Sequence, residues 1–418
     1  MEKKFTSKRA LCTVFGNAMN LLVPDAEDHH QRIAYLSYKM AEYIGLSEGD
    51  REKTAYAALL HDIGIVVMPE RTADSEKGPY TFKELCVTGK SIIGDIPGLD
   101  YVREIFDAEA SDYVNLMAKA ELTKYETMAQ IIDLSDKVVT ALDSKIAALN
   151  QKEDICDTIS DFAGEELKTE IIEAFLNLSN KEYIWFETLH RPDVYLEMIP
   201  ELKDVSLDEM IGYAKFMARI IDYRSRYTTM HSTGVAATAV RLAEIMGMSE
   251  EECKKMLIAG YIHDIGKLKV PKSILDKTEK LTDEEFNIVK EYAYYTFLLL
   301  NDVEGLEQIG KWAALHHERL NGYGYPFGLK ADDIPMGARI LAIADIFSAV
   351  GEIRSYRSGM SRDEIMMILK SNVESGAVSR SIAEIMLTNY DNIYEVRENQ
   401  AKAEGARYYA AVLDVDED

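Results

Sequence analysis

The sequence predicts an all-α protein that contains two copies of one helical module. Apolar residues recur at spacings of three and four along most of the chain, and no segment sustains the alternation of a β-strand. One stretch also occurs twice: HHQRIAYLSYKMAEYIGLSEGDREKTAYAALLHDIG begins at His29, and HSTGVAATAVRLAEIMGMSEEECKKMLIAGYIHDIG begins at His231. Each copy starts with His, breaks at Gly-Leu-Ser or Gly-Met-Ser, and ends in His-Asp-Ile-Gly. Because the order of these features is the same, the two halves are interpreted as one module used twice.

Individual helices follow from the apolar spacing. They are predicted at residues 29 to 44, 49 to 61, 206 to 222, 231 to 246, 249 to 262, 282 to 299 and 304 to 317. Ser47 and Thr282 precede acidic residues and are therefore predicted to be N-caps. The segment from Gly322 to Leu329 is rich in Gly, Tyr and Pro, which predicts a loop.

The length of 418 residues favours two domains over one. We expect a degenerate N-terminal module at 1–150 and a C-terminal module at 206–418. Residues 151–205 lack the repeated pattern but keep helical periodicity, and they are not rich in Gly, Ser or Pro. They are therefore expected to form a helical bridge rather than a flexible tether.

The composition favours a soluble cytoplasmic protein. A formal charge of -25 disfavours binding to nucleic acid polymers and to anionic membranes, although a metal could still attract one small phosphorylated molecule. No run approaches the roughly 18 to 20 apolar residues that span a bilayer, and the N-terminus has no cleavage pattern. The cysteines are scattered without a CxxC pair, which indicates free thiols in a reducing compartment: Cys12, Cys86, Cys156 and Cys253.

Residues with metal-binding side chains concentrate in the C-terminal module, which has four of the eight histidines. The candidate ligands are imidazoles and carboxylates, which suit Fe, Mn or Zn: His231, His263, Asp264, His316, His317 and Asp345. Adjacent helical residues diverge by about 100°, so His263 and Asp264 can serve one site only if the helix ends there, as Gly266 suggests. Alternatively, one carboxylate bridges two ions. Asp345 lies on an otherwise apolar helix, where it must be paired, hydrogen-bonded or bound to metal.

A single buried His or Asp is more often a hydrogen-bonded residue of the core than a metal ligand. The prediction of a metal site therefore depends on the occurrence of all six residues together. Lys267 is positioned to contact a phosphate oxygen, although a lysine near a helix C-terminus can also serve the helix dipole alone. The glycines of the predicted loop would let backbone approach a ligand, and its rings would form a wall for a base; a rigid turn is the alternative. These loop residues are Gly322, Tyr323, Gly324, Tyr325 and Pro326.

These motifs resemble the HD phosphohydrolase superfamily, and the C-terminal module resembles its HD-GYP branch through HDIGK and GYGYP. The resemblance runs from about Asp222 to Arg357. It implies a site with two or three divalent ions, chiefly Fe or Mn, with Zn, Ni, Mg or Co as alternatives. It also implies hydrolysis of a cyclic dinucleotide, chiefly cyclic di-GMP and in some members 3′,3′-cyclic GMP-AMP.

The resemblance assigns the six candidate ligands to the metals, Lys267 to the phosphate and Asp222 to the place of a glutamate in trinuclear members. The signature loop, with the arginines of the IRSYR segment, is expected to bind substrate: Asn321, Gly322, Tyr323, Gly324, Tyr325, Pro326, Arg354 and Arg357. Three positions depart from the family pattern. Tyr292 replaces a ligand histidine, Asn321 replaces an aspartate, and IRSYR lacks a proline.

The N-terminal module resembles the same superfamily in degenerate form. It keeps four residues that could hold one metal: His29, His61, Asp62 and Asp136. However, Ile65 replaces the lysine, and neither a His pair nor a Gly-Tyr-Pro loop lies between residues 66 and 136. A structural or regulatory role is expected, with residual metal binding as the alternative.

The resulting hypothesis is a phosphodiesterase that yields a linear dinucleotide or mononucleotides. Two metals would hold the phosphodiester and activate water for in-line attack, with Asp264 bridging the ions and Lys267 neutralising the phosphate. One alternative is a catalytically weak binding or scaffold module, which Tyr292 and Asn321 support. Another is an HD hydrolase of a different nucleotide or phosphoester. A homodimer or a signalling-protein partner stays open.

Overall fold

The computed structural model describes residues 4–22, 28–68, 80–93, 98–110, 113–192, 204–225, 230–351 and 360–416. Within these ranges the fold is helical apart from a two-residue pairing, in which β1 (Thr6–Ser7) runs antiparallel to β2 (Asp204–Val205). The prediction of an all-α protein is confirmed. The chain divides into two compact units, an N-terminal unit of Leu11–Lys203 and a C-terminal unit of Asp204–Asp418 with Met1–Ala10.

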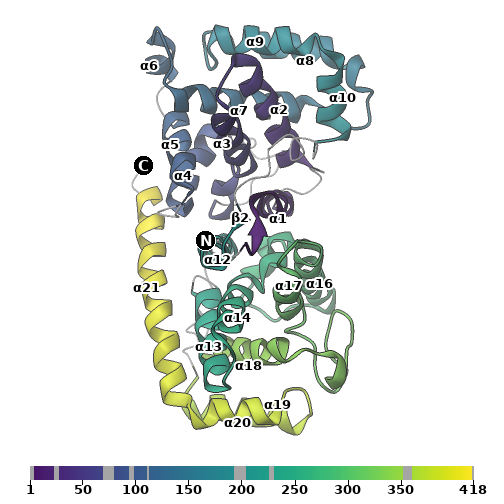
Figure 1. Ribbon diagram of the computed structural model, residues 1–418, viewed down its shortest axis with the longest axis vertical. Coiled ribbons are helices and arrows are strands. Elements are labelled where there is room, and N and C mark those ends of the chain that lie inside the picture. Colours follow the sequence, from purple (N-terminus) through teal and green to yellow (C-terminus); the bar gives the residue numbers. More distant parts are fainter. Residues whose placement is uncertain are drawn as a thin grey trace. The chain divides into compact units, whose positions relative to one another are not determined.

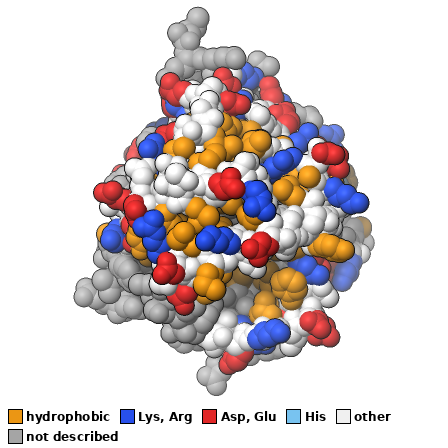
Figure 2. Space-filling model, turned by 90° about the horizontal axis from the view of Figure 1, so that it is seen from below, with side chains coloured by type: hydrophobic (Ala, Val, Ile, Leu, Met, Phe, Trp, Pro, Cys, Tyr) orange, Lys and Arg blue, Asp and Glu red, His pale blue; other side chains and the backbone are white. Residues whose placement is uncertain are grey.

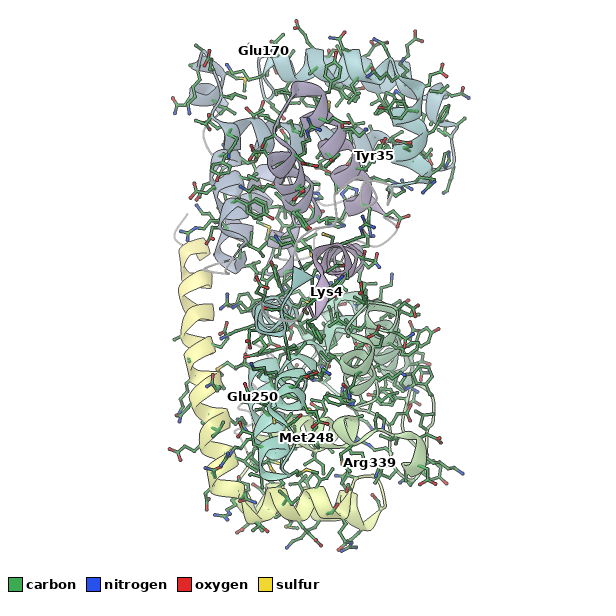
Figure 3. The ribbon with its side chains drawn as sticks, viewed as in Figure 1. Lys4, Tyr35, Glu170, Met248, Glu250 and Arg339 are labelled. Atoms are coloured by element: carbon green, nitrogen blue, oxygen red, sulfur yellow. The ribbon has the colours of Figure 1, made fainter. Side chains whose placement is uncertain are left out.

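The N-terminal unit is built around α2 (His29–Ile44), which packs against α3 (Glu48–Leu59) and α7 (Lys124–Ala141) (Figure 1). The remaining elements are α1 (Lys8–Asn20), η1 (Ile63–Val66), α4 (Phe82–Ile93), α5 (Asp100–Glu109), α6 (Tyr113–Ala118), η2 (Ala148–Asn150), α8 (Lys152–Ser160), α9 (Thr169–Ser179) and α10 (Glu182–His190). In the region expected as a separate bridge, the described helices α8, α9 and α10 belong to this unit. Tyr35, which is labelled in Figure 3, lies in α2. Its hydroxyl donates to the Glu187 carboxylate, and this hydrogen bond connects α10 to α2.

The C-terminal unit is built around α13 (His231–Ile245), which packs against α14 (Glu250–Ile262), α18 (Met336–Gly351) and α21 (Tyr390–Asp416) (Figure 1). The other elements are α12 (Leu207–Arg224), η3 (Ile265–Lys269), α15 (Lys272–Leu275), α16 (Asp283–Leu300), α17 (Glu307–Ala314), η4 (Ala331–Asp333), α19 (Arg362–Glu374) and α20 (Arg380–Thr388). The helix predicted at 304 to 317 is shorter than expected, so its histidine pair follows α17 rather than lying within it.

The predicted helix starts are confirmed. Ser47 Oγ accepts from the Asp50 amide at 3.3 Å, and Thr282 Oγ1 accepts from the Glu285 amide at 3.2 Å. At the second start Glu285 also accepts from the Thr282 amide, which completes a capping box. These caps satisfy backbone donors that a helix start leaves without intrahelical partners, and they fix where the helices around the site begin.

The surface carries charges of both signs. On the face shown in Figure 2, acidic and basic side chains alternate with hydrophobic ones rather than separating into large regions of one sign. None of the helices in the part of the chain that the structure describes is both long and apolar enough to cross a membrane.

Candidate metal centre

The His-Asp motif of the C-terminal unit lies where one helix stops and a tighter one begins. Helix α14 ends at Ile262, and η3 starts at Ile265, so the regular 100° step does not apply between His263 and Asp264. Buried Thr296 of α16 fastens this turn, since its hydroxyl accepts from the Gly266 amide at 3.1 Å and donates to the His263 carbonyl at 3.2 Å. Both motif side chains can therefore face one site, which is one of the two arrangements that the sequence left open.

Asp264 is the centre of the cluster. Its carboxylate lies 3.4 Å from His263 Nε2, 3.7 Å from His231 Nε2 and 4.0 Å from His316 Nε2. The Lys267 ammonium lies 2.5 Å from Asp264 Oδ2. Four cationic or imidazole groups thus surround one buried carboxylate, from residues separated by up to 85 positions in the sequence.

In the described part of the C-terminal unit, two groups of three side chains are close enough to bind ions. His231, His263 and Asp264 form one triad, and His316, His317 and Asp345 form the other; within each triad the ligand atoms lie within 4.8 Å of one another. Asp345 Oδ1 also lies 3.3 Å from His231 Nε2, which connects the triads. All six residues predicted as ligands from the sequence therefore come together in the structure.

Local hydrogen bonds orient the imidazoles. His263 Nδ1 lies 2.8 Å from the Gly260 carbonyl, and His316 Nδ1 lies 2.5 Å from the Ala313 carbonyl. A carbonyl can only accept, so each Nδ1 carries the proton and each Nε2 presents a lone pair to the cluster. This is the tautomer that a metal ligand requires.

Unpaired buried atoms show that the cluster suits a metal. His263 Nε2 and Asp264 Oδ1 are buried without a hydrogen-bond partner, which is costly unless an ion satisfies them. Burial lowers the pKa of His263 to about 4, so its imidazole is neutral. Burial alone would raise the pKa of Asp264, but His263 and Lys267 hold it well below its ordinary value. Neutral imidazoles and an ionised carboxylate are the protonation states that divalent ions bind.

Tyr292 lies against the second triad. Its hydroxyl is 3.0 Å from His316 Nε2 and also contacts His317 Nε2. The ammonium of Lys267 lies 5.0 Å from the centre of its ring. Burial raises the pKa of Tyr292 well above its ordinary value, so the phenol is neutral and hydrogen-bonds to the histidines. In this arrangement Tyr292 is a partner of the two histidines rather than a charged ligand.

Asp222 has a different environment from the one the resemblance implied. Its carboxylate accepts from the Ser232 hydroxyl at 2.6 Å and from the Ser232 amide at 3.1 Å. Among the described residues, neither triad includes Asp222. These bonds fix the first turn of α13, which carries His231, so Asp222 positions a candidate ligand.

The signature loop is organised by a residue that the sequence analysis did not single out. Buried Glu318 accepts from the amides of Phe327 at 2.7 Å, Gly328 at 3.1 Å and Leu329 at 2.9 Å. Gly324 is required because a Cβ there would lie 2.3 Å from the Arg319 amide nitrogen. The only sequence signal for Glu318 was its place directly after the histidine pair.

The residues predicted to bind substrate have different roles in the loop. The Tyr325 ring lies 4.7 Å from the His317 ring, beside the second triad, whereas Tyr323 is 89% exposed. Asn321 donates through Nδ2 to the Ser375 carbonyl at 3.0 Å and accepts from the Tyr323 amide at 3.1 Å. Asn321 therefore anchors the loop. Arg354 and Arg357 lie outside the described residues.

Replacing Glu318 with glutamine is expected to lower the free energy of unfolding by about 2 kcal/mol, because a neutral amide replaces the charged acceptor of three backbone donors. Urea denaturation measures this change. Glu279→Gln, at an exposed position of the same unit, is the matched control and should leave stability within about 0.5 kcal/mol of the parent. Equal stability of the two variants would contradict the role given to Glu318.

The N-terminal unit contains a corresponding cluster. The structure brings together the four residues predicted from the sequence, His29, His61, Asp62 and Asp136. His30, which was not among the residues predicted from the sequence, also lies in this cluster.

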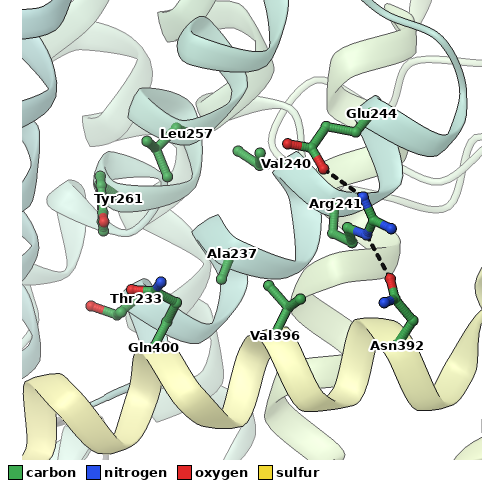
Figure 4. A pocket seen from close by; sticks show the side chains of 10 residues that line it. All are labelled: Thr233, Ala237, Val240, Arg241, Glu244, Leu257, Tyr261, Asn392, Val396 and Gln400. Atoms are coloured by element: carbon green, nitrogen blue, oxygen red, sulfur yellow. Dashed lines mark hydrogen bonds and ion pairs between the residues drawn. The ribbon is translucent and has the colours of Figure 1, made fainter.

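A separate cavity of about 310 Å³ lies between α13, α14 and α21 (Figure 4). Arg241 spans its rim, donating to Asn392 at 2.6 Å and to Glu244 at 2.8 Å. Thr233 lines the cavity, and two residues along a helix correspond to about 200° of rotation, so His231 is on nearly the opposite side of α13. The cavity is distinct from the metal centre.

Comparison with known proteins identifies the two modules. Residues 27–148 and residues 215–381 each match a family model described as an HD domain. The "3'3'-cGAMP-specific phosphodiesterase 1" of Vibrio cholerae is 27% identical over 404 residues, covering 94% of each chain. The "Cyclic di-GMP phosphodiesterase response regulator RpfG" of Xanthomonas campestris is 38% identical over 155 residues, covering 37% of this chain and 41% of that protein.

A solved structure shares the fold. The crystal structure of a cyclic GMP-AMP specific phosphodiesterase of V. cholerae, V-cGAP3, superposes with a TM-score of 0.60 at 18% identity. The match covers 92% of this chain and 98% of that one. The likeness therefore includes both helical units.

Proposed function

Because this chain is a tandem HD-domain protein of the HD phosphohydrolase superfamily, we propose that its C-terminal unit is a metal-dependent phosphodiesterase of the HD-GYP type. The observation that carries the proposal is the pair of connected His/Asp triads with unpaired, buried ligand atoms. Two ions, with Fe or Mn as the first candidates, would occupy these triads. The free cysteines further support a location in the reducing cytoplasm.

The residues of the cluster divide into those that hold metal and those that hold substrate. When bound, divalent ions would polarise the phosphodiester and activate water. Asp264 would bridge the two triads, because the ligands of both surround it. Lys267 would contact a phosphate oxygen, since its partly exposed ammonium already lies at the edge of the cluster. Tyr325 would contact the nucleotide beside the second triad.

We propose a cyclic dinucleotide as the substrate and a linear dinucleotide as the first product. The resemblance to the HD-GYP branch favours cyclic di-GMP. A relative that aligns along nearly the full length of both chains is named for 3′,3′-cyclic GMP-AMP, which supports testing this substrate first and cyclic di-GMP second.

Metal counting and product analysis test the proposal together. The full chain would be purified anaerobically with iron or manganese, and products from both cyclic dinucleotides would be separated by chromatography. Linear products with two ions in the C-terminal unit are expected. Absence of turnover with both triads loaded would overturn the proposal.

Replacing Lys267 with methionine is expected to lower kcat/KM by about 100-fold, because a phosphate-stabilising charge is lost while the aliphatic stem is kept. Lys269→Met is the matched control, since Lys269 is exposed in the same short helix η3. Its kcat/KM should stay within about twofold of the parent. Equal losses in the two variants would show that Lys267 has no specific role.

A second candidate function is a cyclic-dinucleotide-binding module with little turnover. The specific observation in its favour is the Tyr292 hydroxyl, which contacts the metal-binding atoms of both His316 and His317. An ion bound to these two histidine nitrogens would have to displace the Tyr292 hydroxyl. A C-terminal unit that binds one ion, binds the dinucleotide and releases no product would establish this second function.

A further inference from the structure

The two units differ at one position beside their metal-ligand clusters. His29 and His231 begin the repeated sequence, so His30 in the N-terminal unit corresponds to Ser232 in the C-terminal unit. Each is held by a residue ten positions earlier, Asn20 for His30 and Asp222 for Ser232. The repeat therefore includes the ends of α1 and α12, and the C-terminal pair Asp222–Ser232 is replaced by Asn20–His30.

A network of amides fixes the orientation of His30. Gln31 Nε2 donates to Asn17 Oδ1 at 2.9 Å, and Asn20 Nδ2 donates to Gln31 Oε1 at 2.6 Å. Asn20 Oδ1 is left to accept, and it lies 2.8 Å from His30 Nδ1 and 3.3 Å from the His30 amide. The proton of the ring is therefore on Nδ1, and Nε2 has the lone pair.

His30 Nε2 points into the cluster without a partner. The residue is fully buried, and this nitrogen has no hydrogen bond. It lies 3.6 Å from Asp62 Oδ2. Ser232, at the same position in the C-terminal unit, instead donates its hydroxyl to Asp222 and has no such free atom.

The distances from the His29 and His61 imidazoles to the two carboxylates are those that ligands of one ion have. His61 Nε2 lies 3.0 Å from Asp62 and 3.8 Å from Asp136, and His29 Nε2 lies 3.8 Å from Asp62 and 3.5 Å from Asp136. Ligand atoms placed about 2.1 Å from one ion are separated from each other by about 3 to 4 Å. The triads His29–His61–Asp136 and His30–His61–Asp62 share His61, so one ion can be common to both.

We propose that the N-terminal unit binds one divalent ion through five side chains, with His30 as a ligand additional to the HD set: His29, His30, His61, Asp62 and Asp136. Three imidazoles and two carboxylates suit iron, manganese or zinc. The proposal does not rest on the phosphodiesterase activity of the C-terminal unit.

The fifth ligand makes this a closed, structural site. Catalytic metal sites keep positions open for water and substrate, whereas five protein ligands leave at most one position of an octahedron. Ile65 occupies the position that corresponds to Lys267, so no ammonium is available there for a phosphate. The ion would instead join α2, the turn between α3 and η1, and α7, which carry the ligands, and stabilise the N-terminal unit.

The test uses the full chain with His263→Ala, Asp264→Asn, His316→Ala and Asp345→Asn together, which removes two ligands from each of the two C-terminal triads. Iron(II) added anaerobically would be counted after desalting, and X-ray absorption at the iron edge would count the imidazole ligands. His30→Ser copies the C-terminal residue. His190→Ser, at an exposed position of the same unit, is the matched control. Circular dichroism would confirm that each variant is folded.

One ion per chain with three imidazole ligands is expected, with iron affinity at least tenfold lower for His30→Ser and unchanged for His190→Ser. The spectrum of His30→Ser should show two imidazoles. Absence of bound iron from the folded parent variant would overturn the site. Two imidazoles in the parent, or equal affinity in His30→Ser and His190→Ser, would overturn the role of His30. If His30→Ser does not fold, the imidazole count of the parent decides the question.

Discussion

Replacing Asp264 with asparagine is expected to reduce turnover by on the order of 1,000-fold, the upper range for removing one preorganised electrostatic group from a site. Asp264 is buried, and His231, His263 and His316 converge on its carboxylate. An amide of the same shape lacks the negative charge and one of the two carboxylate oxygens with which Asp264 would hold metal. Metal binding to the C-terminal unit should fall with turnover, because Asp264 belongs to the ligand set of the first triad.

The effect can be separated from unfolding. Asp332→Asn makes the same chemical change at an exposed position of η4 and should leave turnover within about twofold of the parent. Metal content, thermal unfolding and turnover would be measured on both variants. A folded Asp264→Asn protein that keeps its metal and most of its turnover would exclude Asp264 as the bridging residue.

The fold and the clustering of the six candidate ligands in the C-terminal unit could be predicted because their signals are local or repeated. The helical period identified α2 and α13, and the duplicated His-Asp-Ile-Gly motif identified both units. The end of α14 before His263 followed from the need to direct two adjacent side chains into one site. These inferences depend on residues that are near one another in the sequence.

The residues that were missed depend on tertiary contacts. His30 is a candidate ligand because Asn20 fixes the orientation of its ring and Asp62 lies beside its free nitrogen. Neither contact can be inferred from the spacing of the sequence. Glu318 has no periodicity or motif of its own, and its role lies in three amides of a folded loop. Asp222 occupies the position where trinuclear members of the family have a glutamate, but its carboxylate accepts a hydrogen bond from the Ser232 hydroxyl. The spacing of motifs in the sequence identifies candidate residues. The direction in which each side chain points depends on tertiary contacts that the sequence does not show.

Replacing Gly266 with alanine is expected to lower the free energy of unfolding by about 3 kcal/mol, because the new Cβ overlaps backbone atoms that cannot move independently. That Cβ would lie 2.0 Å from the Tyr292 carbonyl oxygen and 2.7 Å from the Thr296 amide nitrogen. Gly64 has the same environment in the N-terminal unit, where a Cβ would lie 2.3 Å from the Leu85 carbonyl oxygen. Each glycine lets the turn after the His-Asp motif pack directly on a later helix, α16 for Gly266 and α4 for Gly64.

Turnover should fall together with stability, because relief of the overlap requires η3 to move away from α16. Lys267 lies in η3 and Tyr292 in α16, so such a movement separates groups that now surround Asp264. A displacement of about 1 Å can cost about 100-fold in rate. Gly212→Ala is the matched control, since a Cβ in this part of α12 meets nothing within 4 Å, and it should stabilise the protein by about 0.5–1 kcal/mol. Chemical denaturation of both variants would show opposite signs, whereas stabilisation by both would mean that η3 does not need the close approach to α16.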